Sequence, residues 1–572
     1  MIIERTPWKY LDAYRGKDFS GFWPTLPELF KITTSRFAER PCFTIYEPDR
    51  ISLTYREALI KIEALARHLH SRGLKKGDKA AVTGKNSPEW AVAYLGILFA
   101  GGVVVPIDYQ LKNEEMDLLI KTAGVNILFV DEEKYPRYAE EPGEIKEVIS
   151  LKAGVGAYVY DLEDPGVPQS KEGEIEQAGE EDLAAILFTS GTTGVPKGVM
   201  LTHQNLVADC YLAQGNLELF PEDVFYALLP IHHSYTMLAV LIEAIGCCAE
   251  VVFGKKMVTK AILKDLKDAK ITMFLGVPVL FNKLMAGILR GIRKKGPVVY
   301  GIIMMLMGIS GFFKKVFGVN PGKKIFHSVL EQASLSTLRI CICGGGPLAP
   351  SVFRKFNQMG IDFIQGYGLT ETSPIICLNP VEHYKETSVG RVLPQMEMKI
   401  LSPDERGIGE IIVKGPMVMK GYYEMPEETA EAFTPDGYLK TGDLGYLDEE
   451  NYLYLTGRAK NMIVTEGGKN VYPEEIENEF QLFEEIDQIL VRGFVADRKM
   501  KIEHIEALVY PNPEMKDESG AALSQEVVKA RIDKIISEVN QRLLPYQKII
   551  RTVILEERME ETTTKKIKRD SV

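Results

Sequence analysis

Short apolar runs of strand length alternate along the chain with stretches whose apolar positions recur at helical spacing. The run KAAVT from Lys79 is followed by a helical stretch with a Ser87 cap and then by the run GVVVPID. Similar runs stand at 184–190 (AAILFTS), 250–254 (EVVFG) and 338–346 (LRICICGGG). This alternation is typical of α/β units with parallel sheets. We therefore predict an α/β fold with a large N-terminal body of parallel and mixed sheets and packed helices.

The character of the sequence changes after Gly457. The segment GRAKNMIVTEGGKNVYPEEIENEF leads into a stretch that is acidic early and lysine-rich at its end. We predict that residues 1–459 form the body and that residues 460–572 form a second, smaller α+β domain, with a hinge near Lys460.

Composition and charge exclude several classes of protein. The chain has 572 residues, of which 45% are hydrophobic and 26% charged, as in soluble globular proteins and unlike disordered, collagenous or disulfide-framework chains. Lys and Arg number 68 against 79 Asp and Glu, so the net charge is −11 and we expect no general nucleic-acid binding. Seven cysteines without zinc spacing favour a reducing, cytoplasmic setting. The first residues contain no apolar signal-peptide core.

A segment rich in glycine and hydroxyl groups, LFTSGTTGVPKG, runs from Leu187 to Gly198 directly after an apolar run. Its glycines let backbone N–H groups approach an anion, its hydroxyls can donate to phosphate oxygens, and its lysine adds positive charge. It is not a Walker A loop, because Lys197 is followed by glycine and not by the Ser or Thr that would hold magnesium. The predicted phosphate-binding residues are Thr189, Ser190, Gly191, Thr192, Thr193, Gly194 and Lys197.

This segment resembles the signature of the adenylate-forming superfamily, which includes acyl-CoA synthetases, luciferases and peptide-synthetase adenylation domains. Three more motifs follow in the family's order: YGLTET from Tyr367, YLKTGD ending at Asp443, and GRAK from Gly457. The resemblance runs from about Leu53 to Lys566. It implies that ATP activates a carboxylic acid as acyl-AMP, that a thiol then accepts the acyl group, and that the small C-terminal domain is mobile.

Each motif also has a chemical reason. Attack on the α-phosphate requires a site that holds a triphosphate with Mg²⁺ and stabilises the added charge. Glu371 and Thr189 are suited to bind the magnesium ion, and the Thr370 hydroxyl is suited to hold the α-phosphate. Asp443 can accept both ribose hydroxyls, and Arg458 offers a forked donor nearby. Taken singly, a helix-capping Thr–Glu pair and a turn aspartate are the alternatives.

The turn at 344–349 (GGGPLA) has two interpretations. It fits the G-x-G-x-x-A fingerprint of a dinucleotide site, with Asp362 as the ribose-binding acid, which leaves a hydride-transferring oxidoreductase as an alternative. In the resembled family a G-G-x-P-L turn lies against the adenine. The resemblance therefore adds these nucleotide-binding residues: Gly345, Gly346, Pro347, Gly366, Tyr367, Gly368 and Thr370.

The segment LPIHHSY from Leu229 resembles the family's L-P-x-x-H segment. The resemblance implies that His233 lies beside the acyl carboxylate and that Tyr235 gates the acyl tunnel. Adjacent histidines do not have metal-binding spacing, so we predict no zinc. Ordinary loop or core histidines are the alternative for His232 and His233.

The end of the chain, ETTTKKIKR from Glu561, resembles the family's T-x-x-G-K-I-x-R motif. The resemblance implies that Lys566 contacts the acyl carboxylate and α-phosphate during adenylate formation. This chain has Lys565 where the family commonly has glycine, so both lysines stay candidates. A solvated basic tail is the other interpretation.

The resemblance also implies a domain rotation between the two half-reactions. Lys460 matches the hinge position of the family. Gly467 and Gly468 stand in a loop that resembles the lining of the pantetheine tunnel, where glycine allows close backbone approach.

The uncharged segment 298–313 lies between the basic groups Arg293–Lys295 and Lys314–Lys315. It is shorter than the ~20 residues that span a bilayer, so we expect that it does not cross a membrane. One interpretation is an interfacial anchor on anionic lipid. The other is a buried helix or a cover over the acyl tunnel, and both stay open.

The predicted function is ATP- and Mg²⁺-dependent ligation of a medium- or long-chain fatty acid to CoA, because GRAKNMIVTEGGKNVYPEEIE looks most like long-chain fatty acid:CoA ligases. An acyl carrier protein is the alternative acceptor. A non-catalytic nucleotide-binding membrane scaffold is the alternative from a different class. We expect a cytoplasmic enzyme with peripheral membrane contact, and a homodimer stays open.

Overall fold

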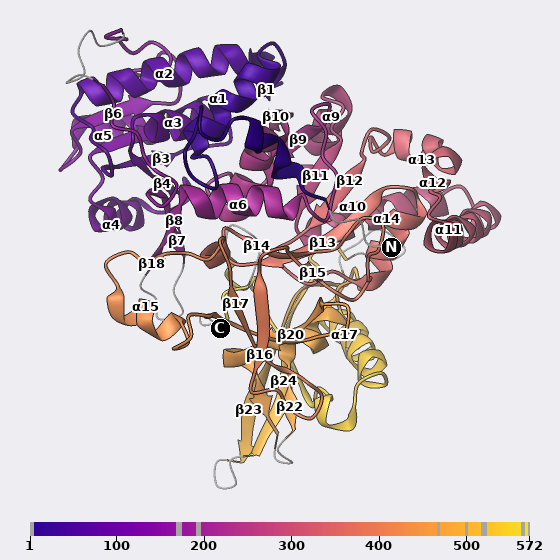
Figure 1. Cartoon of the computed structure of the whole chain (residues 1–572). Coiled ribbons are helices and arrows are strands. Elements are labelled where there is room, and N and C mark those ends of the chain that lie inside the picture. The colour runs from indigo at the N-terminus through magenta and orange to yellow at the C-terminus, as the bar shows by residue number, and fades with distance from the viewer. Residues whose placement is uncertain are drawn as a thin grey trace.

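Two large β-sheets form the body of the protein in the computed structural model, which describes residues 5–166, 174–189, 196–465, 469–497, 502–515, 523–561 and 567–569 (Figure 1). Among these residues, one sheet has thirteen strands and the other has seven. Both sheets combine parallel and antiparallel neighbours. The predicted α/β fold is therefore confirmed.

The strands of the two sheets come from distant parts of the chain. In order across the larger sheet they are β16 (Glu397–Leu401), β17 (Gly409–Lys414), β19 (Leu439–Leu447), β20 (Tyr452–Arg458), β15 (Gly390–Val392), β14 (Ile375–Leu378), β13 (Asp362–Gly368), β12 (Ile340–Cys343), β11 (Met273–Gly276), β9 (Val224–Ala227), β10 (Glu250–Phe253), β1 (Pro41–Ile45) and β2 (Ile51–Thr54). In the second sheet they are β18 (Gly421–Tyr422), β8 (Lys197–Thr202), β7 (Leu183–Thr189), β4 (Val103–Ile107), β3 (Lys79–Thr83), β5 (Ile127–Val130) and β6 (Glu147–Ser150).

The first predicted unit folds as the sequence indicated. β3 and β4 pair in parallel, and α3 (Pro88–Phe99) connects them. The helix begins after Ser87 because the Ser87 hydroxyl accepts a 3.1 Å hydrogen bond from the Trp90 amide. Its residues other than Glu89 are buried, since α3 contacts β1 of the larger sheet as well as β3 and β4 of the second sheet. A helix that is apolar on all sides needs such a place between layers.

Further helices cover the two sheets. They are η1 (Pro7–Ala13), α1 (Leu26–Phe37), α2 (Tyr55–Ser71), α4 (Asn113–Ala123), α5 (Tyr135–Glu140), α6 (His203–Ala213), α7 (Ser234–Thr236), the π-helix η3 (Met237–Ile242), α8 (Glu243–Cys247), α9 (Thr259–Asp268), α10 (Pro278–Arg293), α12 (Gly322–Ile325), α13 (His327–Gln332), α14 (Pro350–Gln358), η4 (Thr370–Thr372) and α15 (Pro426–Ala432). All seven cysteine thiols are free, and all but Cys247 are buried.

The segment 298–313 lies within a longer helix, α11 (Pro297–Phe317). Among the described residues, α11 is the one helix whose length and composition would allow it to cross a membrane. Only 11% of its most apolar window is buried. The interpretation of this segment as a buried helix is therefore wrong, because only one of its faces packs against the protein.

The C-terminal part of the chain has a hydrophobic core of its own, from Ile463 to Ile549. After η5 (Ala459–Asn461) it contains β21 (Ile463–Val464), β22 (Asn470–Val471), α16 (Pro473–Asn478), β23 (Ile486–Asp497), β24 (Ile502–Pro511), α17 (Gln525–Asn540), η6 (Pro545–Gln547) and β25 (Arg551–Ile554). β23, β24 and β25 form a three-stranded sheet. In Figure 1 this orange and yellow part lies below the body.

Candidate active site

The predicted phosphate-binding segment begins and ends in an antiparallel hairpin of β7 and β8. Thr189, the last residue of β7, lies opposite Lys197, the first residue of β8. The Thr189 hydroxyl donates to the Lys197 carbonyl over 3.4 Å. The residues between them that we predicted to bind phosphate, Ser190, Gly191, Thr192, Thr193 and Gly194, lie outside the described residues.

Lys197 and Glu371 meet at a side chain that the sequence analysis missed. Tyr422 in β18 pairs with β8, and the Lys197 ammonium lies 4.8 Å from the centre of the Tyr422 ring. The Tyr422 hydroxyl donates a 3.0 Å hydrogen bond to Glu371 Oε1. Burial and the neighbouring Glu371 carboxylate raise the pKa of Tyr422, so its hydroxyl remains a donor. Tyr422 therefore orients the carboxylate that we predicted to bind magnesium.

The donor types around Glu371 fit Mg²⁺, which prefers oxygen ligands and is usually bound by one or two carboxylates plus substrate phosphates. Glu371 lies in η4 and is half-buried. Strand β8 contacts η4, which brings the hairpin that starts at Thr189 and Lys197 beside this carboxylate. The Glu371 carboxylate would thus hold the ion, and the role of the Thr189 hydroxyl stays a prediction.

A second cluster joins three of the motifs. Asp443 in β19 lies directly opposite Arg458 in β20, and Arg458 Nε is 3.0 Å from Asp443 Oδ1. The Tyr367 hydroxyl donates to Asp443 Oδ2 over 2.7 Å. Burial, reinforced by the Asp443 charge, raises the pKa of Tyr367. A carboxylate has about four acceptor positions, so this buried carboxylate retains acceptors for ribose hydroxyls.

The end of β13 leaves little room for side chains at its two glycines. A Cβ at Gly368 would lie 1.6 Å from the Pro374 carbonyl oxygen. At Gly366 it would lie 3.2 Å from the Cys377 oxygen. Beyond the end of β13, the Thr370 hydroxyl lies 3.2 Å from the Ser234 hydroxyl and shares a hydrogen bond with it. The YGLTET motif is therefore held directly against the LPIHHSY segment.

The glycine turn after β12 lies against Tyr235. A Cβ at Gly344 would come within 2.9 Å of the Tyr235 ring, and the Tyr235 hydroxyl donates to the Ile342 carbonyl over 3.1 Å. Gly345 adopts a positive φ of 79°, and at Gly346 a Cβ would touch only Pro278, at 3.5 Å. A narrow, partly open cleft with no room for a water molecule is lined by mostly apolar residues: Tyr226, Leu229, Tyr235, Thr236, Val240 and Leu275.

The geometry rejects the dinucleotide interpretation of this turn. Asp362 pairs with Ile340 at the start of β12, in the parallel pair β12–β13, whereas Gly344 follows the end of β12. The Asp362 carboxylate accepts a 2.6 Å hydrogen bond from the Lys314 ammonium. Because the acid and the glycine turn lie at opposite ends of the strands, the oxidoreductase alternative is wrong.

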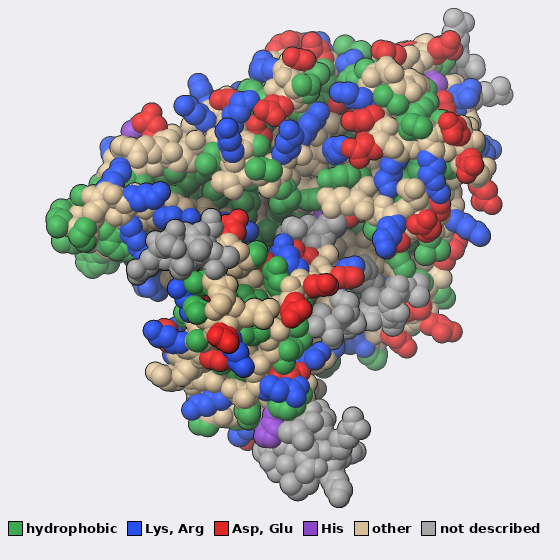
Figure 2. Space-filling model, turned by 180° about the vertical axis from the view of Figure 1, so that it is seen from behind, with side chains coloured by type: hydrophobic (Ala, Val, Ile, Leu, Met, Phe, Trp, Pro, Cys, Tyr) green, Lys and Arg blue, Asp and Glu red, His purple; other side chains and the backbone are tan. Residues whose placement is uncertain are grey.

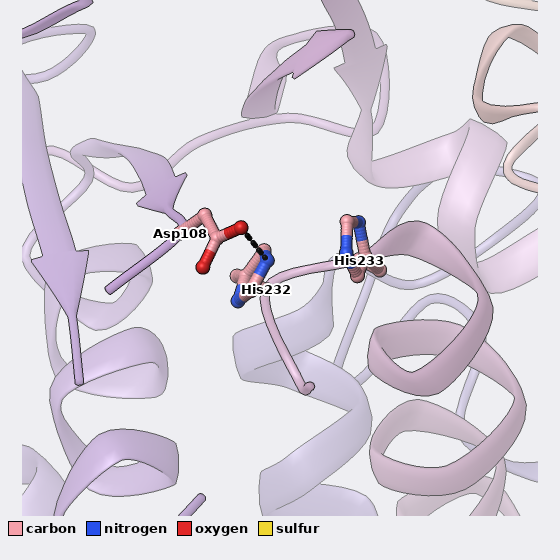
Figure 3. A group of neighbouring side chains, drawn as sticks. All are labelled: Asp108, His232 and His233. Atoms are coloured by element: carbon pink, nitrogen blue, oxygen red, sulfur yellow. Dashed lines mark ion pairs between the residues drawn. The ribbon is translucent and has the colours of Figure 1, made fainter. Parts of the chain in front are cut away.

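His232 and His233 lie near Asp108, which follows β4 (Figure 3). His232 Nε2 is 3.7 Å from Asp108 Oδ2, and the two imidazole rings are 4.2 Å apart. Burial lowers the pKa of His232 to about 3, so this imidazole is neutral near pH 7. One ligand atom from each of the three residues falls within 4.8 Å of the others, a spacing that the sequence alone did not suggest. His233 also directly precedes α7. Its neighbour Ser234 forms the hydrogen bond with Thr370.

The C-terminal part reaches the same region. Gln481 Nε2 donates a 2.9 Å hydrogen bond to the carbonyl of Pro347, in the predicted adenine-binding turn. Lys460 lies in η5, which begins directly after Arg458. The predicted tunnel residues Gly467 and Gly468 lie outside the described residues.

The predicted lysines Lys565 and Lys566 also lie outside the described residues, but the chain on either side of them is fixed. Glu561 and Ile567 form an antiparallel bridge. Arg569 donates to Glu477 Oε1 over 2.7 Å and to the Val491 carbonyl over 2.9 Å. The last motif is therefore attached to the core of the C-terminal part.

The sequence pattern of AMP-binding enzymes matches residues 30–423, which is more than half of the chain. The chain belongs to the AMP-binding enzyme family. The prediction from the four motifs is thereby confirmed.

Named relatives and solved structures agree with this assignment. A long-chain-fatty-acid–CoA ligase of Bacillus subtilis is 30% identical over 510 residues, which are 82% of this chain and 82% of that protein. A feruloyl-CoA synthase of Amycolatopsis is 28% identical over 454 residues, which are 77% of this chain and 80% of that protein. The structure of ATP-bound MatB from Rhodopseudomonas palustris is 25% identical with a TM-score of 0.74, covering 96% of this AMP-binding enzyme and 98% of that chain.

Proposed function

We propose that this AMP-binding enzyme is an ATP-dependent acyl-CoA synthetase for medium- or long-chain fatty acids. The acid's carboxylate oxygen attacks the α-phosphate of ATP, so that acyl-AMP forms and pyrophosphate leaves. The sulfur of CoA then attacks the acyl carbon, and AMP leaves as acyl-CoA forms. The relative from Bacillus subtilis is named for this reaction, and the feruloyl-CoA synthase is named for a related acid.

One observation carries the proposal: five consecutive residues, Tyr367 to Glu371, reach three different groups of side chains. Tyr367 contacts the candidate ribose acceptor Asp443. Thr370 contacts Ser234, next to His233. Glu371 contacts Tyr422, which adjoins the phosphate-binding hairpin. Ribose, reacting acid and triphosphate are the three parts that meet around an α-phosphate, and here their candidate binding groups meet around Thr370.

The roles of the residues follow from their chemistry. Asp443 binds the ribose hydroxyls, and Arg458 holds Asp443 and donates beside it. Thr370 donates to the α-phosphate, where charge develops during the attack. Bound at Glu371, Mg²⁺ would neutralise charge on the triphosphate. Lys197 adds a positive charge on the same side.

The cleft beside Tyr235 has no room for an acyl chain as it stands, but its mostly apolar lining favours an apolar acid as the substrate. Its lining residues offer one hydroxyl from Thr236 and two from tyrosines. None of them is a charged group that would offset the free-energy cost of removing a charged substrate tail from water. The cleft adjoins Gly344 through the Tyr235 ring, so an acyl chain that opened it would lie close to the predicted adenine turn.

We further propose that residues 460–572 rotate about Lys460 between the two half-reactions. Their separate core supports movement as a unit. In the first orientation Lys566 approaches the α-phosphate, and in the second Gly467 and Gly468 line the path of CoA. Gating of this kind lets one adenylate meet two different sets of groups.

The test measures pyrophosphate release and thioester formation across a panel of acids: acetate, octanoate, dodecanoate, hexadecanoate and ferulate. CoA and acyl carrier protein serve as rival acceptors, and Glu371→Gln serves as the background. We expect the fatty acids to exceed acetate and ferulate, with thioester formed on CoA. Preference for ferulate would replace the substrate class, and thioester on carrier protein alone would replace the acceptor. ATP binding without turnover of any acid would favour the nucleotide-binding scaffold.

A further inference from the structure

One face of α11 belongs to the core of the body. Met307 and Ser310 are fully buried, and Met307 packs into the core beside α14. The Lys314 ammonium donates 2.6 Å hydrogen bonds to Asn357 Oδ1 and Asp362 Oδ1. These contacts fix the rotation of the helix about its axis.

The opposite face of α11 is apolar and exposed. Its residues follow one another at alternating intervals of four and three, which places them on a single stripe of the helix. Their exposed fractions run from 44% at Ile309 to 73% at Val298. This outer face consists of Val298, Ile302, Met305, Ile309, Phe312 and Val316.

Other apolar helices of the chain are covered. α3 is comparably apolar, yet all of its residues but Glu89 are buried between the sheets. A contiguous apolar face on the surface of a soluble protein marks a site of interaction. In Figure 2 hydrophobic side chains gather on the projection that α11 forms at the edge of the molecule, next to Lys and Arg side chains.

The charge around this face differs in sign from that of the whole chain. Between Asp268 and Glu331 there is no acidic residue, although the net charge of the protein is −11. Exposed basic residues stand at both ends of α11, among them Lys294, Lys295 and Lys315. The basic residues of this stretch are Lys270, Lys283, Arg290, Arg293, Lys294, Lys295, Lys314, Lys315, Lys323 and Lys324.

We propose that the outer face of α11 docks on an anionic lipid membrane, with the helix lying in the plane of the headgroups. An apolar stripe with basic groups beside it is what such a surface binds. A spanning orientation would require α11 to leave α14 and would break the contacts of Lys314 with Asp362 and Asn357. A second copy of the chain would bring the same basic groups against each other, so lipid is the better partner.

The test is flotation of the full chain with phosphatidylcholine vesicles, with and without phosphatidylglycerol. We expect the wild type to float with the anionic vesicles. The triple variant Ile302→Ser, Met305→Ser, Phe312→Ser should bind them more weakly by about a hundred-fold or more, because three apolar side chains no longer enter the membrane. The matched control Ile60→Ser, Leu118→Ser, Val527→Ser changes exposed apolar residues on other elements and should bind as the wild type does.

A second triple variant tests the charge separately. Lys294→Glu, Lys295→Glu, Lys315→Glu should weaken binding to anionic vesicles by about ten-fold or more. The same change at the exposed residues Lys17, Lys121 and Lys529 should have a smaller effect. Equal effects of the two charge variants would show that only the overall charge matters, which would overturn docking through α11.

Two further results would overturn the proposal. In the first, the serine variant loses thermal stability but still floats, so that α11 acts as core. In the second, neither protein floats, and ultracentrifugation shows that the wild type is a dimer and the serine variant a monomer. The outer face of α11 would then join two copies of the chain. Flotation requires no ATP, acid or CoA, so its outcome is independent of the proposed reaction.

Discussion

The hydroxyl of Tyr367 donates a 2.7 Å hydrogen bond to Asp443, which lies 76 residues further along the chain. The other carboxylate oxygen of Asp443 lies 3.0 Å from Arg458 Nε. These two contacts fix the plane of a buried carboxylate before any nucleotide arrives. An acceptor that is already oriented loses less freedom when it binds a ligand, so Tyr367 and Arg458 act on ATP through Asp443.

We expect Asp443→Ala to weaken ATP binding by about 100-fold or more, because two ribose hydroxyls lose a charged acceptor and each such hydrogen bond contributes roughly 1.5–3 kcal/mol. Tyr367→Phe should have a smaller effect, since Arg458 still holds the carboxylate. Calorimetric titration with a non-hydrolysable ATP analogue measures both affinities. The control is Asp448→Asn at the other end of the same hairpin, where Asp448 binds Lys385. If Asp443→Ala kept the wild-type affinity, Asp443 would not belong to the site.

The contact between Tyr422 and Glu371 leads to a second prediction. Tyr422→Phe removes the 3.0 Å hydrogen bond to Glu371 but keeps the ring beside Lys197. We expect the Mg²⁺ concentration for half-maximal pyrophosphate release to rise by about 10-fold, the lower end of the effects of residues that orient metal ligands. Tyr423→Phe, at the next position, is the control and should leave the Mg²⁺ dependence unchanged. An unchanged Mg²⁺ dependence in both variants would remove Glu371 from the metal site.

Local signals in the sequence predicted the elements that depend on neighbouring residues. The Ser87 cap starts α3 because its hydroxyl reaches the amide three residues later, and the apolar runs fold as parallel strands on either side of it. The glycine at 368, the last residue of β13, is likewise explained by a neighbour six residues later, the Pro374 carbonyl oxygen. Such features require no knowledge of distant parts of the chain.

Features that depend on long-range contacts could not be predicted from the sequence. Tyr422 reaches Glu371 because the two-residue strand β18 pairs with β8, and a strand of two residues has no periodic pattern. α11 extends beyond the uncharged segment to Phe317, and the Lys314 ammonium in this extension binds Asp362, 48 residues away. Burial of one face of α11 also depends on its packing against α14.

Lys460→Pro should separate the two half-reactions. Proline fixes φ near −65° and resists rotation at the proposed hinge. We expect pyrophosphate release to continue in a single turnover while thioester formation from the bound adenylate slows strongly. Lys460→Ala, which leaves φ free, is the control and should keep both steps. Equal loss of both steps in the proline variant would place the hinge elsewhere.

The two adjacent lysines near the end of the chain can be distinguished by supplying the intermediate. Lys566→Ala should nearly abolish adenylate formation, because its charge is needed where charge develops on the α-phosphate. The same variant should still convert supplied acyl-AMP to acyl-CoA. Lys565→Ala should retain both steps. The opposite pattern would assign the role to Lys565.

The buried carboxyl group of Glu243 makes stability depend on pH. Glu243, in α8, accepts a 2.8 Å hydrogen bond from Gln214 Nε2 and is 3% exposed. Burial raises the pKa of Glu243 from 4.5 to about 8. Between these two pH values the folded protein keeps a proton that the unfolded chain releases. The free energy of unfolding should therefore fall as the pH rises, by about 1.4 kcal/mol for each pH unit from this group.

Glu243→Gln removes the titrating proton while it keeps the shape of the side chain. The free energy of unfolding of the variant should therefore fall less steeply with pH than that of the wild type. We expect it to resemble the wild type near pH 5 and to be more stable than the wild type near pH 8. Urea unfolding at intervals from pH 5 to pH 8 measures the difference. Glu427→Gln, on the exposed side of α15, is the control and should follow the wild type at every pH. If Glu243→Gln declined as steeply as the wild type, Glu243 would be ionised in the folded protein, and its burial could not be the cause of the slope.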